Sequence, residues 1–453
     1  MTRSFLWTGV RLAALCSLLL LAACGGKQIP PRDGIPSPHL GTIRDMRSFP
    51  QDLTVFAQQA GADTPLLDSQ AQAEQDARFN RIFFGPWDMR KTSIRKRDVE
   101  IYFRKAKGYK YGDVRWTQDE WDAMRANAGL KSFPNTAMYG ITVRNADLRE
   151  MPSHTPRFSE PTPDPRINPF DYFQYSLLPV GTPVFIAHTS RDGNWYYVET
   201  PVAAGWVDAN DIGIVDEAFE ASYKTGSYVA VLRDNVPLPG SLAGQVNIGT
   251  VLPLAPSQSD NTRLAVLVPV KNGSRATVVT LPLAHEDAAI KPLPMTPAQV
   301  ALIGNVMVGQ RYGWGGMFGA RDCSALTREL LTPFGIWLPR NSLSQARSGR
   351  RIMLDGMSIK EKEKAILRDG VPFLTLVWLR GHIMLYVGPY KGRPAIFHNV
   401  WGVRTVEGAS DNERFVIGRA VVSSITPGSE LRNLYRTTTF GDRVNSITVL
   451  GGR

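Results

Sequence analysis

Cysteine is scarce in this chain, with three residues among 453. Cys16 lies in an apolar N-terminal run and Cys24 follows directly after that run, so we expect Cys323 to be the only free thiol of the folded protein. One thiol excludes a disulfide framework and a cysteine-rich zinc site. Cys323 is then either a small residue of the core or a thiol used in chemistry.

Long apolar runs are also missing, apart from the one at the N-terminus. Two arginines precede the run from Leu12 to Leu21, which is too short to span a bilayer comfortably. Residues 1–23 are therefore interpreted as an export signal. The sequence Leu21-Ala22-Ala23-Cys24 resembles the lipobox of bacterial lipoproteins, which implies that Cys24 carries lipid and holds the chain on a membrane. An ordinary cleaved signal or an uncleaved anchor helix is the alternative.

The residue after Cys24 bears on the choice of membrane. It is Gly25, and not the aspartate that is associated with retention in the inner membrane. For a bacterium with two membranes, we therefore expect a lipid anchor in the outer membrane, with the protein facing the periplasm.

Acidic residues are fewer than basic ones, at 41 against 52, which gives a formal net charge of +11. Loss of Arg3 and Arg11 with the signal leaves 50 basic residues and a charge of +9. This excess favours anionic partners through long-range attraction. Nucleic acid does not fit an exported protein, whereas phospholipid head groups and wall polymers do. The alternative is a solvated surface of scattered basic residues.

The length exceeds that of a single core, since one domain takes roughly 100 to 200 residues. Residues 24–50 contain five prolines and few apolar side chains, and are interpreted as a tether. Residues 51–134 have a mostly helical pattern with a capping box at Thr117–Glu120 and Gly129 placed to end that helix. The aromatic cluster Phe83–Trp87 is interpreted as packing.

Short β-rich runs follow between residues 135 and 290, and predict two small barrels. The first unit covers residues 135–215 and the second covers residues 216–290. The first unit resembles bacterial SH3-like domains in Gly193-Asn194-Trp195-Tyr196-Tyr197-Val198, followed by Gly205-Trp206-Val207. The second unit repeats the all-β pattern more weakly. The clearest expected strands are 182–187, 195–198, 228–232, 264–270 and 276–281.

A further domain, residues 291–453, begins where Thr296 and Pro297 predict the start of a helix that runs towards Met307. Next, a glycine-rich loop leads into Cys323 and an expected helix over residues 324–331. Backbone N–H groups at a helix N-terminus favour a negatively charged thiolate, which is the nucleophilic form of cysteine. This position favours a reactive thiol over an inert one.

Two histidines lie downstream of Cys323 in strand-like segments. His382 begins the segment 382–388, and His398 lies within the segment 395–399. One imidazole could take the cysteine proton while the other orients it, as in a catalytic triad. From the residues alone, a core cysteine and two structural histidines are an equally valid interpretation.

Five motifs, which follow one another along the chain, support a resemblance to a known family. They are Tyr312-Gly313-Trp314-Gly315-Gly316, Asp322-Cys323-Ser324, Leu338-Pro339-Arg340-Asn341-Ser342, Gly381-His382 and Ile396-Phe397-His398. With these, residues 296 to about 425 resemble the NlpC/P60 family of papain-like cell-wall cysteine peptidases. The resemblance implies an α+β fold in which a papain-like domain follows two SH3-like barrels and a helical stabilising segment.

The resemblance also implies the site. Cys323 would be the nucleophile, His382 the general base and later the acid, and His398 the residue that orients His382. Tyr312 would help to stabilise the oxyanion, together with the backbone N–H of Cys323. No metal and no organic cofactor are implied.

Asp322 and Ser324 flank the nucleophile and, by the same resemblance, would contact the substrate. The domain order resembles γ-D-glutamyl-diamino-acid endopeptidases, so the expected substrate is the stem peptide of peptidoglycan, cut between D-glutamate and meso-diaminopimelate or a similar diamino acid. We expect a monomer. Alternatives are another thiol amidase or acyltransferase, and a wall-binding lipoprotein with an inactive domain.

Three segments depart from the pattern of the family. Ala325 stands where glycine is usual, and residues 374–378 replace a strand that usually begins with glycine and aspartate. Only residues 201–204 fill the place of a longer loop, which in some relatives carries a tyrosine that recognises a free amino terminus. None of these departures removes a catalytic group, but the short loop argues against exopeptidase-like selectivity.

Overall fold

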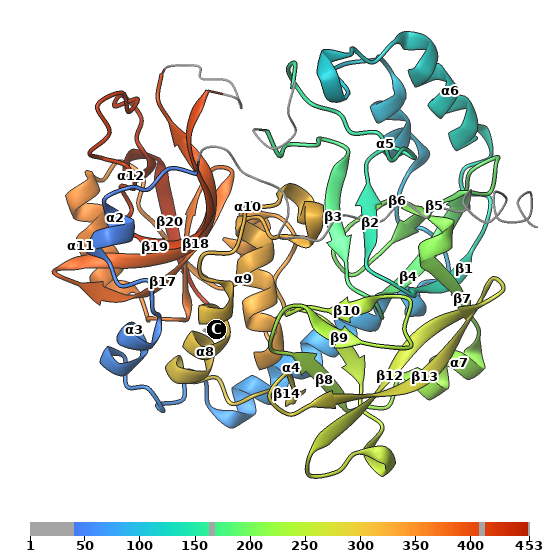
Figure 1. Ribbon diagram of the computed structural model, residues 1–453, viewed down its shortest axis with the longest axis horizontal. Coiled ribbons are helices and arrows are strands. Elements are labelled where there is room, and N and C mark those ends of the chain that lie inside the picture. Colours follow the sequence, from blue (N-terminus) through green and yellow to red (C-terminus); the bar gives the residue numbers. More distant parts are fainter. Residues whose placement is uncertain (1–39, 163–167, 407–412, 452–453) are drawn as a thin grey trace, which may run out of the picture. The chain divides into compact units, whose positions relative to one another are not determined.

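The computed structural model describes residues 40–162, 168–406 and 413–451 (Figure 1). The expected export signal, the expected lipid attachment at Cys24 and the expected tether as far as residue 39 lie outside this part of the chain. Among the described helices, none is both long enough and apolar enough to cross a membrane. The described chain is 29% helix and 31% strand, which confirms the α+β class.

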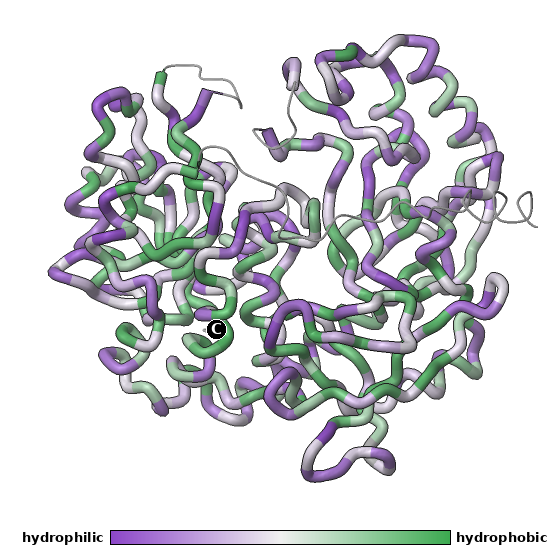
Figure 2. The backbone as a smooth tube through the Cα atoms, in the orientation of Figure 1, coloured by the Kyte–Doolittle hydropathy of each residue, from purple (hydrophilic) through white to green (hydrophobic). Residues whose placement is uncertain are grey.

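The C-terminal part is built on an antiparallel six-stranded sheet in the order β15-β20-β16-β17-β18-β19. The bounds are β15 (Arg350–Met353), β16 (Thr375–Leu379), β17 (His382–Tyr390), β18 (Arg393–Arg404), β19 (Arg414–Ser423) and β20 (Val444–Val449). Figure 2 shows the middle strands of this sheet mostly in the colour of hydrophobic residues. Their side chains alternate between the two faces, so both faces need cover.

Helices cover both faces of this sheet. On one face, α8 (Pro297–Met307) and α9 (Cys323–Leu331) bury apolar side chains such as Ile303 and Leu326 in one cluster with Leu385 and Phe397. On the other face, α11 (Ile359–Asp369) buries Ile366 among the alternate strand residues. The short helices α10 (Ser342–Gln345) and α12 (Phe440–Arg443) complete this part of the chain. The N-cap Thr296 and the helix to Met307 are confirmed.

The segment from residue 40 to residue 59 packs on the same sheet. In α2 (Asp45–Ser48), the carboxylate of Asp45 accepts hydrogen bonds from the N–H and the hydroxyl of Ser424, at 2.8 and 2.6 Å. After it, α3 (Thr54–Gln59) packs on α8. Residues 40–50, for which we expected a tether, are thus held against β19 by a buried carboxylate.

The next helices are α4 (Ser69–Phe84), α5 (Lys96–Glu100) and α6 (Gln118–Ala128), with short 3₁₀ turns between them. The capping box of α6 forms as predicted, and Gly129 ends the helix in the left-handed conformation. Phe84 and Trp87 are buried against Phe219 and Tyr223, which confirms that this aromatic cluster packs.

Strands of both β units share one nine-stranded sheet, in the order β12-β13-β7-β1-β4-β5-β6-β2-β3. Its strands are β1 (Met138–Thr142), β2 (Ala146–Arg149), β3 (Gln174–Leu178), β4 (Pro183–Thr189), β5 (Trp195–Glu199), β6 (Ala204–Asp208), β7 (Ile212–Val215), β12 (Arg263–Asn272) and β13 (Arg275–Ala284). All five clearest strand predictions are confirmed. The link between the units is a parallel pair, Arg275 with Ile214.

The rest of the second β unit forms two small sheets. One has the order β11-β8-β14 and the other pairs β9 with β10. The second unit begins with α7 (Glu217–Tyr223). The bounds are β8 (Tyr228–Val231), β9 (Val236–Leu238), β10 (Gly244–Val246), β11 (Val251–Pro253) and β14 (Ala288–Lys291). The domain boundaries of the sequence analysis stay predictions.

Candidate active site

Cys323 is the first residue of α9, one residue before the predicted start. Asp322 caps the helix, because its carboxylate accepts a hydrogen bond of 2.9 Å from the N–H of Ala325. The thiol is buried, with 8% of the residue exposed. The backbone N–H of Ile383 donates to the sulfur, which places the thiol beside the start of β17, where His382 lies.

The electrostatic surroundings of the thiol differ from the expectation. Burial and, to a smaller extent, the nearby Asp322 carboxylate raise the pKa of Cys323 to about 12. The N–H groups of Ile383 and Ser324 and the Arg340 guanidinium oppose this shift but are outweighed. The helix N-terminus therefore does not hold the thiol as a thiolate, because burial and, after it, the carboxylate that caps the same helix outweigh its effect on the pKa.

The two histidines form the pair that the sequence suggested. Nε2 of His382 and Nδ1 of His398 are 2.8 Å apart, and Nε2 of His398 lies 3.0 Å from the hydroxyl of Ser423 on β19. That hydroxyl donates its proton to the carbonyl oxygen of Ser424 at 2.8 Å. The structure therefore adds Ser423, which the sequence analysis did not identify.

These bonds decide the tautomer of each ring. The Ser424 carbonyl can only accept, so the Ser423 hydroxyl donates to it and accepts from Nε2–H of His398. Nδ1 of His398 is then an acceptor and takes a hydrogen bond from Nε2–H of His382. Nδ1 of His382 carries the lone pair, and it has no hydrogen-bond partner among the described residues. It is the free base of the site.

Both rings are neutral near pH 7. Burial lowers the pKa of His398 to about 3. Burial also lowers the pKa of His382 well below its usual value, and the neighbouring His398 and Arg443 add to this effect. The resting site therefore holds a neutral thiol and a neutral imidazole, and charge develops only when the proton moves during attack.

Tyr312 lies close enough to the thiol for the two groups to interact electrostatically. Burial raises the pKa of Tyr312 well above its usual value, and Cys323 and Asp322 raise it further, so the phenol keeps its proton. Its ring contacts Phe170 and Trp401, with centroids 6.2 and 5.9 Å apart. A protonated hydroxyl beside the nucleophile can donate to an oxyanion.

Asp322 and Ser324 are held in a buried network around Arg340. The guanidinium donates to both Asp322 oxygens, at 3.2 and 2.5 Å, and to the Ser324 hydroxyl at 2.8 Å. It also reaches Ser176 of the first β unit at 3.0 Å. Asp322 further accepts from the N–H of Gly315 at 3.2 Å. Both side chains thus have a structural role, and their contact with substrate stays a prediction.

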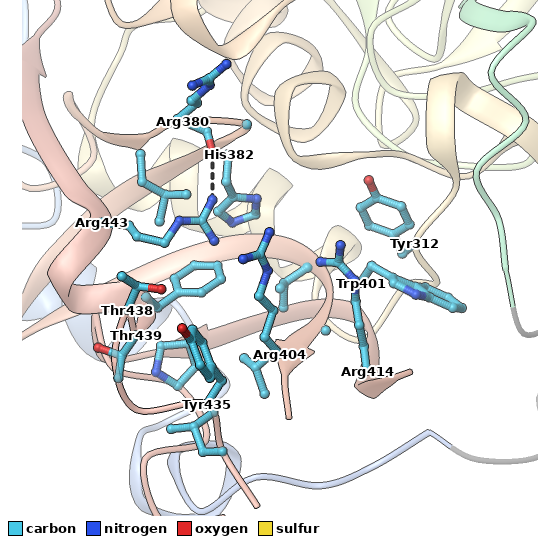
Figure 3. Close-up of a pocket in the computed structure, with 18 of the residues that line it drawn as sticks. Tyr312, Arg380, His382, Trp401, Arg404, Arg414, Tyr435, Thr438, Thr439 and Arg443 are labelled. Atoms are coloured by element: carbon cyan, nitrogen blue, oxygen red, sulfur yellow. Dashed lines mark hydrogen bonds between the residues drawn. The ribbon is translucent and has the colours of Figure 1, made fainter. Parts of the chain in front are cut away.

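A cleft of about 300 Å³ opens beside His382 (Figure 3). Phe170, Trp314 and Trp401 form an aromatic wall, in which the Phe170 ring lies 5.2 Å from Trp314 and 6.1 Å from Trp401. Phe170 precedes β3, so the first β unit contributes to the cleft. The sequence analysis did not identify this contribution, since nothing local in the sequence predicts it.

The charged residues described in the cleft lining are all basic. Its charged residues are Arg380, Arg404, Arg414 and Arg443, and no Asp or Glu is among its described residues. Within the described ranges, no group of three His, Cys, Asp or Glu residues is placed to hold a metal ion.

Comparison with protein families matches three parts of the chain. Residues 13–133 match the N-terminal stabilising domain of NlpC/P60 proteins, residues 156–208 match an SH3 domain of the SH3b1 type, and residues 309–419 match the NlpC/P60 family. The last range includes all six predicted site residues outside the lipobox. No curated protein matches the chain.

Two solved structures are similar. An NlpC/P60 endopeptidase from Photobacterium damselae subsp. piscicida is 25% identical over 91% of this chain and 98% of its own, with a TM-score of 0.78. An NlpC/P60 family protein from Bacillus cereus ATCC 10987 is 16% identical over 60% of this chain and 81% of its own, with a TM-score of 0.41. The chain thus carries the stabilising, SH3 and catalytic domains of the NlpC/P60 family, and it is a cysteine peptidase.

Proposed function

We propose that this peptidase cuts the bond between the γ-carboxyl group of D-glutamate and the diamino acid in stem peptides of peptidoglycan. NlpC/P60 peptidases are generally cell-wall hydrolases. The observation that carries the finer proposal is that His382, whose neighbour Ile383 donates its N–H to the Cys323 sulfur, lines a cleft with four arginines and, among its described residues, no carboxylate. Stem peptides present carboxylates around the D-glutamate bond, and a basic cleft favours them.

The proposed reaction starts from the neutral pair. Nδ1 of His382 takes the thiol proton as the sulfur of Cys323 attacks the carbonyl carbon of the γ-linked amide. The oxyanion accepts hydrogen bonds from the Tyr312 hydroxyl and the backbone N–H of Cys323. His382 then gives its proton to the amine of the diamino acid, which leaves, and a thioester remains on Cys323.

Water completes the cycle. His382, again neutral, accepts a proton from water, and the oxygen attacks the thioester carbonyl. The sulfur leaves and recovers the proton from His382, so the enzyme returns to its starting state. His398 keeps the reactive nitrogen of His382 directed at the thiol throughout, since its own ring is fixed by Ser423.

The proposal extends to the setting of the enzyme. We take Cys24 to be lipidated and the protein to act as a monomer at the outer membrane, on the periplasmic side. The structural likeness to an endopeptidase supports action within wall peptides. So does the short turn after β5, where residues 201–204 leave no room for a long loop over the amino-terminal side of a substrate.

The test is a digestion of purified sacculi and soluble stem peptides by residues 27–453, with product identification by mass spectrometry. The expected products end at D-glutamate, and Cys323→Ala produces none of them. Products that end at another residue, or equal digestion by the variant, would contradict the proposal.

A further inference from the structure

The four arginines of the cleft come from four separate elements. Arg380 precedes β17, Arg404 ends β18, Arg414 begins β19 and Arg443 ends α12. Figure 3 shows the side chains of Arg404 and Arg443 extending into the space beside His382. Arg443 lies beyond residue 419, where the match to the NlpC/P60 family model ends.

Two of these side chains, Arg443 and Arg404, differ in their hydrogen-bond partners. Arg443 is fixed, because its Nη2 donates to the carbonyl oxygen of Arg380 at 2.9 Å. Arg404 is exposed, and its guanidinium has no hydrogen-bond or ion-pair partner among the described residues. One anchored and one available guanidinium next to each other suit a planar anion with two oxygens, which is the geometry of a carboxylate.

Like charges meet in this cluster of arginines. Burial lowers the pKa of Arg443, and the positive charges of Arg404 and Arg414 lower it further. Like charges held together at a half-buried position repel each other. An anion that enters the cleft would reduce this repulsion, so the cluster favours anion binding.

The arginine cluster also affects the pKa of the base, His382. The positive charge of Arg443 lowers the pKa of His382. An anion bound to Arg443 would cancel this effect and make His382 a stronger base. Recognition of the anion is therefore coupled to proton transfer, and its loss should lower kcat as well as raise KM.

We propose that Arg404 and Arg443 bind a free side-chain carboxylate on the diamino acid that leaves in the reaction, so that the enzyme selects carboxylated stem peptides over those with a lysine or an amidated side chain. This inference rests on the proposed function. His382 gives its proton to the leaving amine, so the leaving residue lies on the His382 side of the cleft, where both guanidinium groups are.

Three tripeptides that share one scissile bond test the inference. They are L-Ala-γ-D-Glu followed by meso-diaminopimelate, by its side-chain amide, or by L-lysine. All three carry the same main-chain carboxylate, so only the side-chain carboxylate differs. For the native enzyme we expect kcat/KM to be about tenfold or more higher for the carboxylated peptide, since a charge-assisted hydrogen bond is strong.

Two substitutions of Arg404 sharpen the test. Arg404→Gln should bring the ratio of kcat/KM values for the carboxylated and amidated peptides close to one, and Arg404→Glu should favour the lysine peptide. Because the side chain has no partner in the described structure, we expect both variants to fold, which a thermal melt verifies. Arg368→Gln is the matched control, since Arg368 is exposed, pairs with Asp369 and lies outside the cleft.

The results distinguish failure of the carboxylate site from failure of the proposed function. Equal cutting of the three peptides by the native enzyme, or an unchanged ratio in Arg404→Gln, would overturn the carboxylate site and leave the proposed function standing. Cutting of none of them would overturn the proposed function, and the carboxylate site with it.

Discussion

The carbonyl oxygen of Ser424 decides which nitrogen of His382 is the base. Through Ser423 and His398 it sets a chain of three hydrogen bonds that all point the same way. If no group fixed the direction of these hydrogen bonds, each histidine ring would have two tautomers of comparable energy. Only one tautomer of His382 presents a lone pair to the thiol. Ser423 is therefore expected to matter for activity although it does not touch the nucleophile.

Ser423→Ala should lower kcat about tenfold, a part of what general base catalysis contributes, and leave KM nearly unchanged. Ser423→Thr keeps the hydroxyl and should keep most of the activity. Ser424→Ala is the matched control: its hydroxyl serves Asp45, so this variant should lose thermal stability but not kcat. Steady-state kinetics and a thermal melt of the three variants check this, and equal kcat in both alanine variants would contradict it.

The raised pKa of Cys323 predicts how the free thiol reacts. In the form that starts at residue 27, Cys323 is the only cysteine, so an alkylating reagent reports on it alone. Since its pKa is raised to about 12, the thiolate fraction is small at pH 7. The alkylation rate should rise about tenfold per pH unit from pH 7 to pH 10, because the thiolate is the reactive form. A rate that is constant between pH 5 and pH 9 would indicate a preformed thiolate–imidazolium pair instead.

The sequence predicted which residues meet at the site better than it predicted their partners. Cys323 and His382 occur in motifs with a fixed local structure, a helix start and a strand start. Ser423 is found only through the register of β18 against β19, which pairs distant segments. The arginines of the cleft come from four elements, so no local pattern could have gathered them.

Among the elements, the loop that leads to the nucleophile depends on the first β unit. Residues 314–319 pack on β3, and a Cβ on Gly316 would lie 2.4 Å from Cβ of Leu177 and 2.9 Å from its backbone nitrogen. Gly316 also has a φ of +86°, which favours glycine. The close approach of backbone to backbone holds the loop in place, and the loop in turn holds Asp322 through Gly315.

Gly316→Ala should lower the melting temperature and kcat together, because the loop has to move away from β3. Gly309→Ala is the matched control, since Gly309 has a φ of +78° but nothing within 4 Å of the added Cβ. That variant should lose only the roughly 1–2 kcal/mol of a left-handed alanine, with little effect on kcat. Similar kcat values in the two variants would argue that the contact with β3 does not position the nucleophile.

Helices and strands with a local sequence pattern could be predicted. The distant elements beside which they lie could not. The helix after Thr117 and the strand at Trp195–Val198 follow from capping and alternation. The joining of β13 to β7 does not, because it links two units through one parallel pair. Side-chain pattern fixes which face of a strand is buried but not which distant strand lies beside it.

In the whole molecule, a buried ion pair joins the second β unit to the catalytic domain. Both terminal nitrogens of Arg321 donate to Asp234 at 2.6 Å, and Nε donates to Glu329 at 2.6 Å. The Arg321 and Asp234 side chains are 5% and 7% exposed. Arg321 lies two residues before the nucleophile, so the β unit supports the site through this pair.

Asp234→Ala should destabilise the protein by about 3–5 kcal/mol, because it leaves the Arg321 charge buried with one partner fewer. Asp287→Ala is the control: Asp287 pairs with Arg233 at 4.0 Å, and the Arg233 side chain is 57% exposed. Removing this surface pair should cost about 0–1 kcal/mol. Denaturant unfolding gives both values, and equal values would show that the buried pair does not join the two parts.

The order of the domains could be predicted from changes in composition and residue pattern along the chain. The way in which the domains pack on one another could not. Residues 40–50 look like a tether by composition, yet Ile43 and Asp45 are buried on the catalytic sheet. Burial of a few residues in a proline-rich segment depends on a surface that is formed by residues about 380 positions later, such as Ser424.

The central claim, that Cys323 is the nucleophile, can be tested by trapping the intermediate. The enzyme is mixed with a stem tripeptide, quenched in acid within one turnover, digested and examined by mass spectrometry. The account predicts the L-Ala-D-Glu acyl group as a thioester on the fragment that carries Cys323, and neither adduct nor hydrolysis with Cys323→Ala. An acyl group on another residue, or hydrolysis by the variant at the native rate, would contradict it.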